Sequence, residues 1–318
     1  MAIPVDSRAI NQVVASTREA VRPVVVDALY KSNPLLARLL SKDKVVLAGG
    51  EEIRVPFMYD ELPGGWYSGL DAFTAQAKEI ITDLRFDWKQ VYASVTLPSI
   101  DVAKNMAPHR LFDIVAAQFS GARMTLSKKL GTELYNLGTD VNRITGLRLA
   151  ISTTGTYGKI TRGSDVIGTA IKAGLEDTTG GSVTVPMIND FMGQASAGGA
   201  EKQDLLLSTQ LLWDALWARV QPKQYYQNPG GADTANMGFA VLKINGADVV
   251  ADSYCPVGFI FGVNTNYIEF YVMDGYDFYV RGPFELHGQD GFTAQVVTYC
   301  ELAIQNPRLC FSASGLTA

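Results

Sequence analysis

Two strand-like runs decide the fold of this chain, EEIRVPF (residues 51–57) and IITDLRFDWKQVYASVTL (residues 80–97). Between them lies a glycine-rich segment with several aromatic residues, LPGGWYSGLDAF (residues 62–73). In the first run, apolar and polar residues alternate from Ile53 to Phe57, which is typical of a strand with one covered face. Pro56 has no N–H to donate to a sheet, so this strand is predicted to lie at an edge. The three segments together predict a long β-hairpin with an aromatic tip.

The second run changes its apolar face partway along. The apolar face falls on even numbers at Leu84, Phe86 and Trp88. Beyond Gln90 it falls on odd numbers, at Val91, Ala93, Val95 and Leu97. A strand that changes its buried side must twist, bulge or pass from one packing environment to another. An arm that leaves its own core to lie on another subunit would change sides in this way. A plain bulge within one domain is the alternative.

A long amphipathic helix is predicted directly after the hairpin, starting at Pro108. Its apolar residues recur at steps of three or four, and they form a single stripe about seven turns long: Leu111, Val115, Phe119, Ala122, Leu126, Leu130, Leu134 and Leu137. Gly121 and Gly131 weaken the helix, so they mark places of close packing or a bend. Gly138 is a natural C-terminal stop. A long hairpin followed by such a helix favours an assembly protein over an enzyme.

Composition limits the function further. The chain has 318 residues, a length that favours two domains. Its net charge is -5, and it has no block of Lys or Arg. Tight binding to many phosphates needs a basic surface, so a sequence-reading nucleic-acid binder is not expected. No signal peptide and no membrane-spanning apolar run is present in the sequence. We therefore expect a soluble protein made in a cytoplasm. The widely spaced Cys255, Cys300 and Cys310 are expected to be small buried thiols.

The second half of the chain alternates short helices and strands. From Ile144 the composition becomes richer in Gly, Thr and Ser, which indicates a domain boundary. Asn245-Gly246 is a strong hairpin signal. Helices are predicted over 35–40, 186–197 and 209–220. Strands are predicted over 204–208, 241–244, 249–250, 258–263, 268–273, 278–280, 292–305 and 307–314.

No conventional active site is found. His109 and His287 are the only histidines, and neither has a second ligand at metal spacing. The segment 155–159 is glycine-rich but lacks the phosphate-loop arrangement, so it is interpreted as a turn. Neighbouring carboxylates such as Glu51 and Glu52 face opposite sides of a strand and are interpreted as solvated charges. We expect no catalytic residue, no cofactor and no metal.

The aromatic residues at the hairpin tip are the candidate site. Trp66, Tyr67 and Phe73 lie in a glycine-rich loop, where exposed aromatic side chains usually need a partner surface. We therefore expect them to contact another subunit, with Arg54 and Lys78 of the same hairpin as charged members of the interface. The alternative is a tip that folds back onto its own domain.

Several short motifs, in the same order along nearly the whole chain, resemble major capsid proteins of tailed bacteriophages. Those of the hairpin and helix are WYSGLD (66–71), FDWKQVYASVT (86–96), KN (104–105), LGTELY (130–135) and GT (138–139). Further along are ITGL (144–147), YGKITR (157–162), residues 211–226 with QPKQYY at their end, NTNY (264–267), NPR (306–308) and GL (315–316). Each motif alone is weak, and their order makes the resemblance specific.

The resemblance implies an α+β fold of the Hong Kong 97 type. It implies an N-terminal arm (1–47), an extended loop (48–84), a peripheral domain (85–143 and 276–304) with a spine helix (108–137), and an axial domain (144–275 and 305–318). The apolar switch near Gln90 would then fall where the extended loop rejoins its own sheet. A fused scaffolding segment is not expected, because the arm before Val24 is short. The covalent Lys–Asn crosslinks of some relatives are not carried over to Lys78, because no partner or catalytic acid is matched.

The resemblance also implies a function. The chain would self-assemble into hexamers and pentamers of an icosahedral head shell around double-stranded DNA, without sequence-specific binding and without a membrane. Its partners would be copies of itself, a portal protein, and scaffold or decoration proteins. It would be found in the virion after assembly in the host bacterial cytoplasm. An encapsulin-like compartment shell is the alternative within this fold. A two-domain hydrolase, the alternative from another class, would need an active-site cluster that the sequence lacks.

Overall fold

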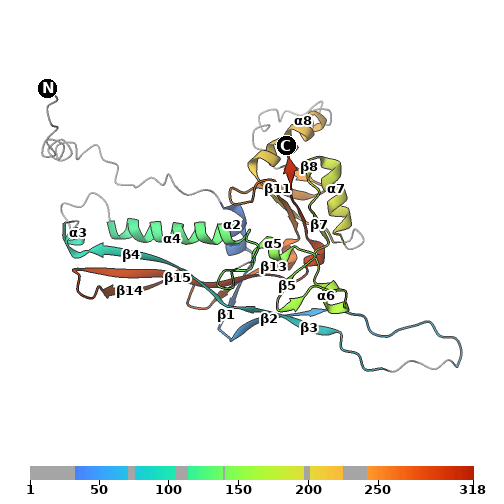
Figure 1. The fold of residues 1–318 in the computed structure, drawn as a ribbon, viewed down its shortest axis with the longest axis horizontal. Helices are drawn as coiled ribbons and strands as arrows, with labels where there is room; N and C mark the ends of the chain where they lie inside the picture. Colours follow the sequence, from blue (N-terminus) through green and yellow to red (C-terminus); the bar gives the residue numbers. More distant parts are fainter. Residues whose placement is uncertain (1–32, 71–75, 105–113, 139, 197–200, 225–241) are drawn as a thin grey trace. The chain divides into compact units, whose positions relative to one another are not determined.

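A computed structural model describes residues 33–70, 76–104, 114–138, 140–196, 201–224 and 242–318 (Figure 1). The chain divides into two units. Unit 1 comprises Met1–Tyr30, Tyr92–Leu126 and Val280–Val296, and unit 2 comprises Lys31–Val91, Ser127–Tyr279 and Val297–Ala318. Residues 1–32 of the expected N-terminal arm lie outside the described residues.

The long second strand of the predicted hairpin is in fact two strands in two different sheets. β2 (Glu52–Met58) pairs with β3 (Ile81–Asp87) in a two-stranded antiparallel sheet. After Trp88, β4 (Lys89–Pro98) pairs instead with β15 (Gly291–Ile304). The change of sheet explains the change of apolar face, because each sheet has its own covered side. Of the three predicted explanations, passage from one packing environment to another is confirmed.

The prediction that the first strand lies at an edge is also confirmed. In the part of the chain that the structure describes, β2 pairs with β3 alone. Pro56 stands opposite Asp83 in this register. Its missing N–H leaves a gap in the row of donors along the strand and makes this edge less able to pair with another strand.

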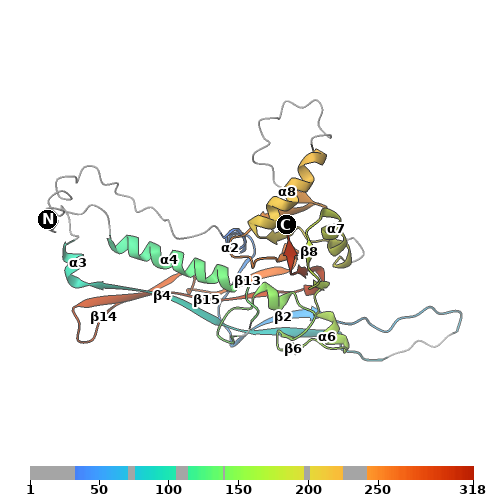
Figure 2. The ribbon, with the colours of Figure 1, turned by 45° about the horizontal axis from the view of Figure 1, so that its top comes forward.

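Unit 1 is built from strands and a helix that run alongside one another (Figures 1 and 2). It contains β4 from Tyr92 onward, α3 (Ser99–Lys104), most of β14 (Tyr279–Glu285), β15 up to Val296, and α4 (Ile114–Glu133) up to Leu126. The side chains of Thr96 on β4 and Thr293 on β15 are hydrogen-bonded, with 3.1 Å between their Oγ1 atoms. The buried side chains of the unit are small or aliphatic: Ala93, Val95, Leu97, Ala122, Leu126, Ala294 and Val296.

The long helix predicted over 108–137 is present as α4, and its apolar stripe is largely confirmed. Ala122, Leu126 and Leu130 are buried, and the stripe continues to Leu134 in the turn that follows. Leu137, predicted to end the stripe, is exposed, because the helix already ends at Glu133. The predicted first turns, 108–113, lie outside the described residues.

The two helix glycines differ. A Cβ atom added at Gly131 would lie 2.1 Å from Asn33 Nδ2, so this glycine permits the close packing that was predicted. Asn33 caps α2 (Pro34–Ser41), since its side chain accepts a hydrogen bond from the Leu36 N–H. At Gly121 an added Cβ would meet no described atom within 4 Å.

The centre of unit 2 is a six-stranded mixed sheet with both faces covered. Its strand order is β10 (Leu242–Ile244), β11 (Ala247–Ala251), β9 (Leu205–Ser208), β12 (Ile260–Val263), β16 (Phe311–Ala313) and β7 (Leu175–Asp177). In β9, Leu206 packs in one apolar cluster with residues of α7 (Val185–Gln194) and α8 (Gln210–Gln224). Leu205 and Leu207 pack in a second cluster. A strand buried on both sides appears as a continuous apolar run, as its sequence does.

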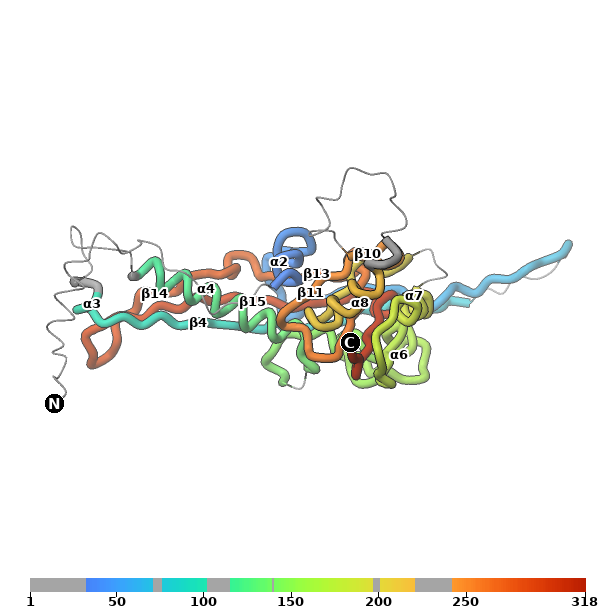
Figure 3. The backbone as a smooth tube through the Cα atoms, turned by 90° about the horizontal axis from the view of Figure 1, so that it is seen from above, coloured from blue at the N-terminus to red at the C-terminus, as the bar shows by residue number. Residues whose placement is uncertain are grey.

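Unit 2 also contains several shorter strands and helices outside this sheet (Figure 3). β13 (Ile268–Met273) has the bounds that were predicted, and it pairs with β1 (Lys44–Leu47) and with the last residues of β15. β10 and β11 form the predicted hairpin, with positive φ at Asn245 and Gly246. The shorter elements are α5 (Leu147–Ala150), β5 (Thr156–Tyr157), β6 (Ile160–Thr161), α6 (Val166–Ala170), β8 (Gly181–Ser182), η3 (Thr265–Tyr267), η4 (Pro307–Leu309) and β17 (Leu316–Thr317).

The three cysteines are free and buried, as predicted. Burial raises the pKa of each thiol, to about 12 at Cys310, so these groups stay protonated and unreactive near neutral pH. Trp213 and Trp217 stack on each other at 5.5 Å between ring centroids and pack against a core cluster.

Candidate subunit interface

The β2–β3 hairpin is rooted in the core of unit 2. Seven residue pairs join its two strands, from Glu52 opposite Asp87 to Met58 opposite Ile81. One face of its base is buried, because the side chains of Ile53, Val55, Leu84 and Phe86 all belong to the larger core cluster of unit 2. The alternation in the sequence thus places one row of side chains in the core and the other row in solvent.

A second, smaller hairpin packs against this base. β5 and β6 are joined through Gly158 and Lys159, both with positive φ, which confirms that this segment is a turn. The Gly158 carbonyl accepts a hydrogen bond of 3.1 Å from the Arg85 N–H. A Cβ added at Gly158 would lie 2.7 Å from Leu84 Cδ2, so only glycine allows this close approach. The sequence motif was interpreted correctly as a turn, but its contact with the long hairpin was not foreseen.

An aromatic contact lies beside this turn. The rings of Tyr157 and Phe86 meet edge to face with 5.3 Å between their centroids. The Tyr157 hydroxyl accepts a hydrogen bond of 2.7 Å from the Ile304 N–H and donates one of 3.1 Å to the Ile304 carbonyl. Its burial raises the pKa of Tyr157. Tyr157 therefore connects the base of the hairpin to β15.

Lys159 joins both strands of the long hairpin. Its ammonium donates to Glu52 on β2 and to Asp87 on β3, the latter at 2.9 Å from Oδ1. The hydrogen bond from Lys159 lowers the pKa of the Asp87 carboxyl and keeps it ionised. The interpretation of Glu52 as a merely solvated charge is therefore wrong, because its carboxylate forms this ion pair. Sequence reasoning missed the pair because its members are more than 100 positions apart.

The neck of the hairpin, where the two chains leave the paired strands, has its own local bonds. The Tyr59 N–H donates to the Ile80 carbonyl at 3.0 Å, and the Tyr59 hydroxyl donates to the Glu79 carbonyl at 2.8 Å. Lys78 Nζ lies 2.6 Å from Asp60 Oδ2 and 3.0 Å from the Glu61 carbonyl. This hydrogen bond from Lys78 lowers the pKa of Asp60. Hydrogen bonds and an ion pair thus join the two chains of the neck.

Beyond the neck, the tip presents apolar side chains to solvent. Trp66 and Leu70 are fully exposed, and Leu62 and Tyr67 are about two-thirds exposed, at 65% and 66%. The alternative interpretation required the tip to fold back onto its own domain. The described tip side chains are exposed instead. Phe73 lies outside the described residues.

The four predicted interface residues that the structure describes are therefore spread along the hairpin. Trp66 and Tyr67 lie together at the tip, and Lys78 lies at the neck in its own ion pair. Arg54 is exposed on β2, with its Nε atom 3.9 Å from Asp83 Oδ2. Leu62 and Leu70 were missed as candidates. Their position beside the glycines of the tip is the signal that could have identified them.

The described residues hold no group of three or more His, Cys, Asp or Glu side chains that could bind a metal ion. None of the described helices is both long enough and apolar enough to cross a membrane. Burial raises the pKa of the Glu301 carboxyl to about 7. One of its oxygens accepts hydrogen bonds from the backbone N–H groups of Thr145 and Leu302, at 2.6 and 3.0 Å. These bonds suit a structural role.

No protein-family model matches the chain, and no curated protein matches its sequence. Solved structures do. The chain is similar to the capsid of cyanophage A-1(L), with a TM-score of 0.74 and 14% identity over 94% of this chain and 96% of that one. It is similar to the SrpI encapsulin of Synechococcus elongatus, with a TM-score of 0.63 and 13% identity over 96% and 95%. For the capsid of a native GTA particle, the TM-score is 0.62 and the identity is 13%, over 96% and 98%.

These similar structures cover nearly the full length of both chains. Two of them are capsids and one is an encapsulin complex. The chain therefore has the Hong Kong 97-type fold that phage capsid proteins and an encapsulin share.

Proposed function

We propose that this chain is a major capsid protein of a tailed phage, which assembles into hexamers and pentamers of an icosahedral head around double-stranded DNA. The single observation that carries the proposal, beside the shared fold, is the contrast within the β2–β3 hairpin. Its base is buried in unit 2, while its tip exposes Trp66 and Leu70 completely. Large apolar side chains exposed together at the end of a hairpin mark a surface that binds a partner.

The tip also favours repeated assembly over a simple dimer. A hairpin that inserts into a different surface of a second copy makes a head-to-tail contact, and such contacts form rings where the rotation between copies closes. Rings of five and six are the units from which an icosahedral shell is formed. Trp66 and Tyr67 are the aromatic members of the proposed contact, and Arg54 and Lys78 are its charged members. Phe73 is proposed with them from its place in the sequence.

The remaining parts follow the same plan. We assign residues 1–47 to an N-terminal arm, 48–84 to the extended loop, 85–143 and 276–304 to a peripheral domain, and 144–275 and 305–318 to an axial domain. The net charge of -5 suits a container that encloses DNA without gripping it. A portal protein, scaffold or decoration proteins, assembly in the host bacterial cytoplasm and a place in the virion belong to the same proposal.

The proposal is tested by the size of the purified protein. We expect particles with icosahedral symmetry in cryo-electron micrographs, and light scattering far above that of a 34.5 kDa chain. A protein that stays monomeric or dimeric under every assembly condition would overturn the shell function.

An encapsulin-like compartment is the second candidate, and the similarity to the SrpI encapsulin is the observation that favours it. The content of the particles separates the two functions. Double-stranded DNA recovered from nuclease-treated particles would support the phage head. Particles that hold a cargo protein and no nucleic acid would support the compartment.

A further inference from the structure

Glu301 is a buried residue of β15 whose carboxyl group the proposed function does not use. Its side chain has no exposed surface. One carboxyl oxygen, Oε1, accepts hydrogen bonds from the backbone N–H groups of Thr145 and Leu302. The other, Oε2, is buried and has no hydrogen-bond partner in the described part of the chain. Glu301 therefore joins the segment 140–146, which lies between α4 and α5, to β15, with only one of its two oxygens satisfied.

The surroundings of Glu301 favour its neutral form. Lys89 on β4 faces the carboxyl group, and its charge lowers the pKa of Glu301, but burial outweighs this effect and raises the pKa to about 7. Tyr157 on β5 and Cys300 on β15 interact with the same carboxyl group, and Tyr271 on β13 stands opposite it in the register. Burial raises the pKa of all three of these groups, so they remain protonated where Glu301 changes its charge.

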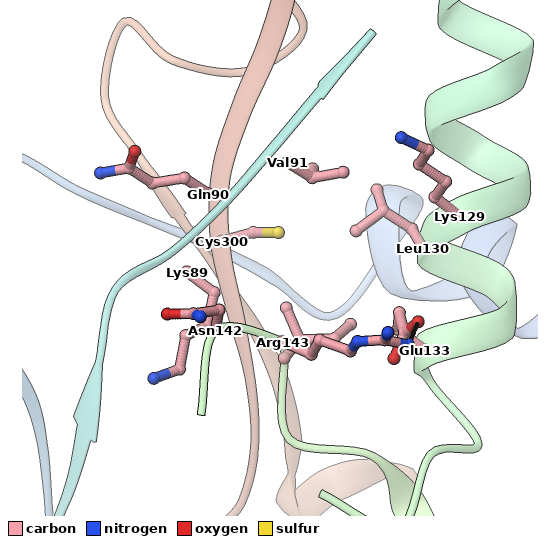
Figure 4. A pocket seen from close by; sticks show the side chains of 10 residues that line it. Lys89, Gln90, Val91, Lys129, Leu130, Glu133, Asn142, Arg143 and Cys300 are labelled. Atoms are coloured by element: carbon pink, nitrogen blue, oxygen red, sulfur yellow. Dashed lines mark hydrogen bonds and ion pairs between the residues drawn. The ribbon is translucent and has the colours of Figure 1, made fainter. Parts of the chain in front are cut away.

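A hollow with a volume of about 290 Å³ lies beside the segment 140–146 (Figure 4). Its lining includes Ile144 and Cys300, which are the chain neighbours of Thr145 and Glu301. Residues 140–143 of the segment are exposed, apart from residue 139 before them, which lies outside the described residues. In contrast, β15 is paired with β4, β13 and β14. The segment is therefore the cover of Glu301 that can move aside with the smaller loss of contacts.

We propose that Glu301 is a proton-controlled latch between the segment 140–146 and β15. While the carboxyl group is neutral, the segment stays closed over it. When the group loses its proton, the buried charge needs water at Oε2, and the segment opens toward the hollow to admit it. The proposal does not depend on the proposed function.

The direction of the pH dependence follows from proton binding. The closed chain holds the Glu301 proton more tightly than the open chain, because the pKa is about 7 when the group is buried and 4.5 when water surrounds it. Opening therefore becomes more favourable as the pH rises above 4.5, and it levels off above about 7.

Hydrogen exchange of the purified, unassembled full chain between pH 5 and pH 8 tests the latch, with mass spectrometry as the readout. After correction for the intrinsic exchange rate, the opening constant of peptide 140–150 should rise roughly tenfold per pH unit up to about pH 7 and then level off. It should exceed the opening constant of peptide 205–208 in β9 at every pH, because the opening is local. A pH-independent constant in 140–150, or one equal to that of β9, would overturn the proposal.

Glu301→Gln has the shape of the neutral acid and does not titrate, so it should keep the segment closed up to pH 8. Glu133→Gln is the matched control, because it makes the same chemical change at the ion-pair partner of Arg143 in the same segment. It should raise the opening constant at every pH and leave its pH dependence in place. A pH dependence that persists in Glu301→Gln would refute the latch.

Lys89→Met provides a second test if Glu301→Gln does not fold. It removes the cation that favours the ionised carboxyl group. The rise in the opening constant should therefore continue to a higher pH than in the parent chain before it levels off. An unchanged profile would show that Glu301 does not control the opening. Circular dichroism checks the fold of each variant.

Discussion

The base and the tip of the β2–β3 hairpin belong to one continuous stretch of chain, yet they differ in almost every contact. At the base, Leu84 is fully buried, Gly158 is packed against it, and Lys159 joins both strands. At the tip, Trp66 and Leu70 are fully exposed. The side chains of the base are packed within the chain, whereas those of the tip are exposed to solvent. On the proposed function, the base of the hairpin would serve folding and the tip would serve assembly.

The largest expected effect comes from comparing two leucines of this hairpin, one at its base and one at its tip. Leu84→Ala should lower the free energy of unfolding by about 3 kcal/mol, because it leaves a cavity in a closed core. Leu70→Ala should change it by less than about 0.5 kcal/mol, because the side chain already contacts water. Urea unfolding of the unassembled chain measures both. A Leu70→Ala loss close to that of Leu84→Ala would mean that the tip packs on its own domain in solution.

A second contrast is between the carboxyls of the hairpin and Glu301 in the core. The hydrogen bond from Lys159 lowers the pKa of Asp87, whereas burial raises the pKa of Glu301 from 4.5 to about 7. Because the folded chain holds the Glu301 proton more tightly than the unfolded chain, its contribution to stability is fully present below pH 4.5 and is lost as the pH rises through 7. The loss amounts to about 3 kcal/mol between these limits.

Glu301→Gln tests this pH dependence directly, because an amide of the same shape does not titrate. Unfolding by urea at pH 5 and at pH 8 should show a smaller fall in stability for the variant than for the parent chain. Asp87→Asn is the matched control on the hairpin, and its stability should not improve relative to the parent as the pH rises. An identical pH profile for Glu301→Gln and the parent would show that Glu301 titrates normally.

The tip is expected to matter for assembly and not for folding. Trp66→Ala/Tyr67→Ala should weaken each intersubunit contact by about 2 kcal/mol, which is the order of aromatic residues at the centre of an interface. That loss corresponds to a roughly thirtyfold higher protein concentration for half-assembly, measured by light scattering. The urea unfolding curve of the unassembled variant should match that of the parent. Val257→Ala, at an exposed residue outside the hairpin, is the control for assembly.

If the double variant assembles like the parent, the tip makes no important contact, and the assembly function must be carried by another surface. If its unfolding curve moves as well, the tip contributes to the fold of its own chain. Only loss of assembly with unchanged unfolding supports the division between base and tip.

Local patterns in the sequence predicted much of this fold. The strand predicted over 268–273 is present as β13 with the same bounds. The even-to-odd switch beyond Trp88 predicted a twist, a bulge or a change of packing environment, and the structure has the last of these. These signals depend on which side of an element is covered, and neighbouring residues record that directly. Asn245-Gly246 gave a turn for the same local reason, since its backbone needs positive φ.

The rest depends on contacts between distant residues. The parallel pairing of β1 with β13, more than 200 positions away, was not foreseen. The ion pairs of Lys159 with Glu52 and Asp87 were missed for the same reason. Charged residues are common on strand surfaces, and the sequence does not say which of them meet. The tip was the part of the candidate site that sequence could find, because its exposure follows from its own glycines and aromatic residues.

The smallest effect is expected from Lys159, whose ion pairs are exposed to solvent and weakened by salt. Lys159→Met should leave global unfolding nearly unchanged, since Leu84 and Phe86 still fill the core. It should nevertheless increase the rate of amide exchange in β2 and β3, because the side chain that joins the two strands is lost. Hydrogen exchange with mass spectrometry on peptides 52–58 and 81–87 measures this directly.

The matched control for this change is Lys78→Met at the neck, which removes a lysine that pairs with Asp60 on the other chain of the same hairpin. Its effect should be confined to peptides around residues 59–62 and 76–80, beyond the paired strands. If Lys159→Met leaves β2 and β3 as protected as in the parent, the hairpin is fixed by the close packing of Gly158 and Leu84 alone. Apolar packing alone would then distinguish the base from the tip, and the charged residues would contribute only to solubility.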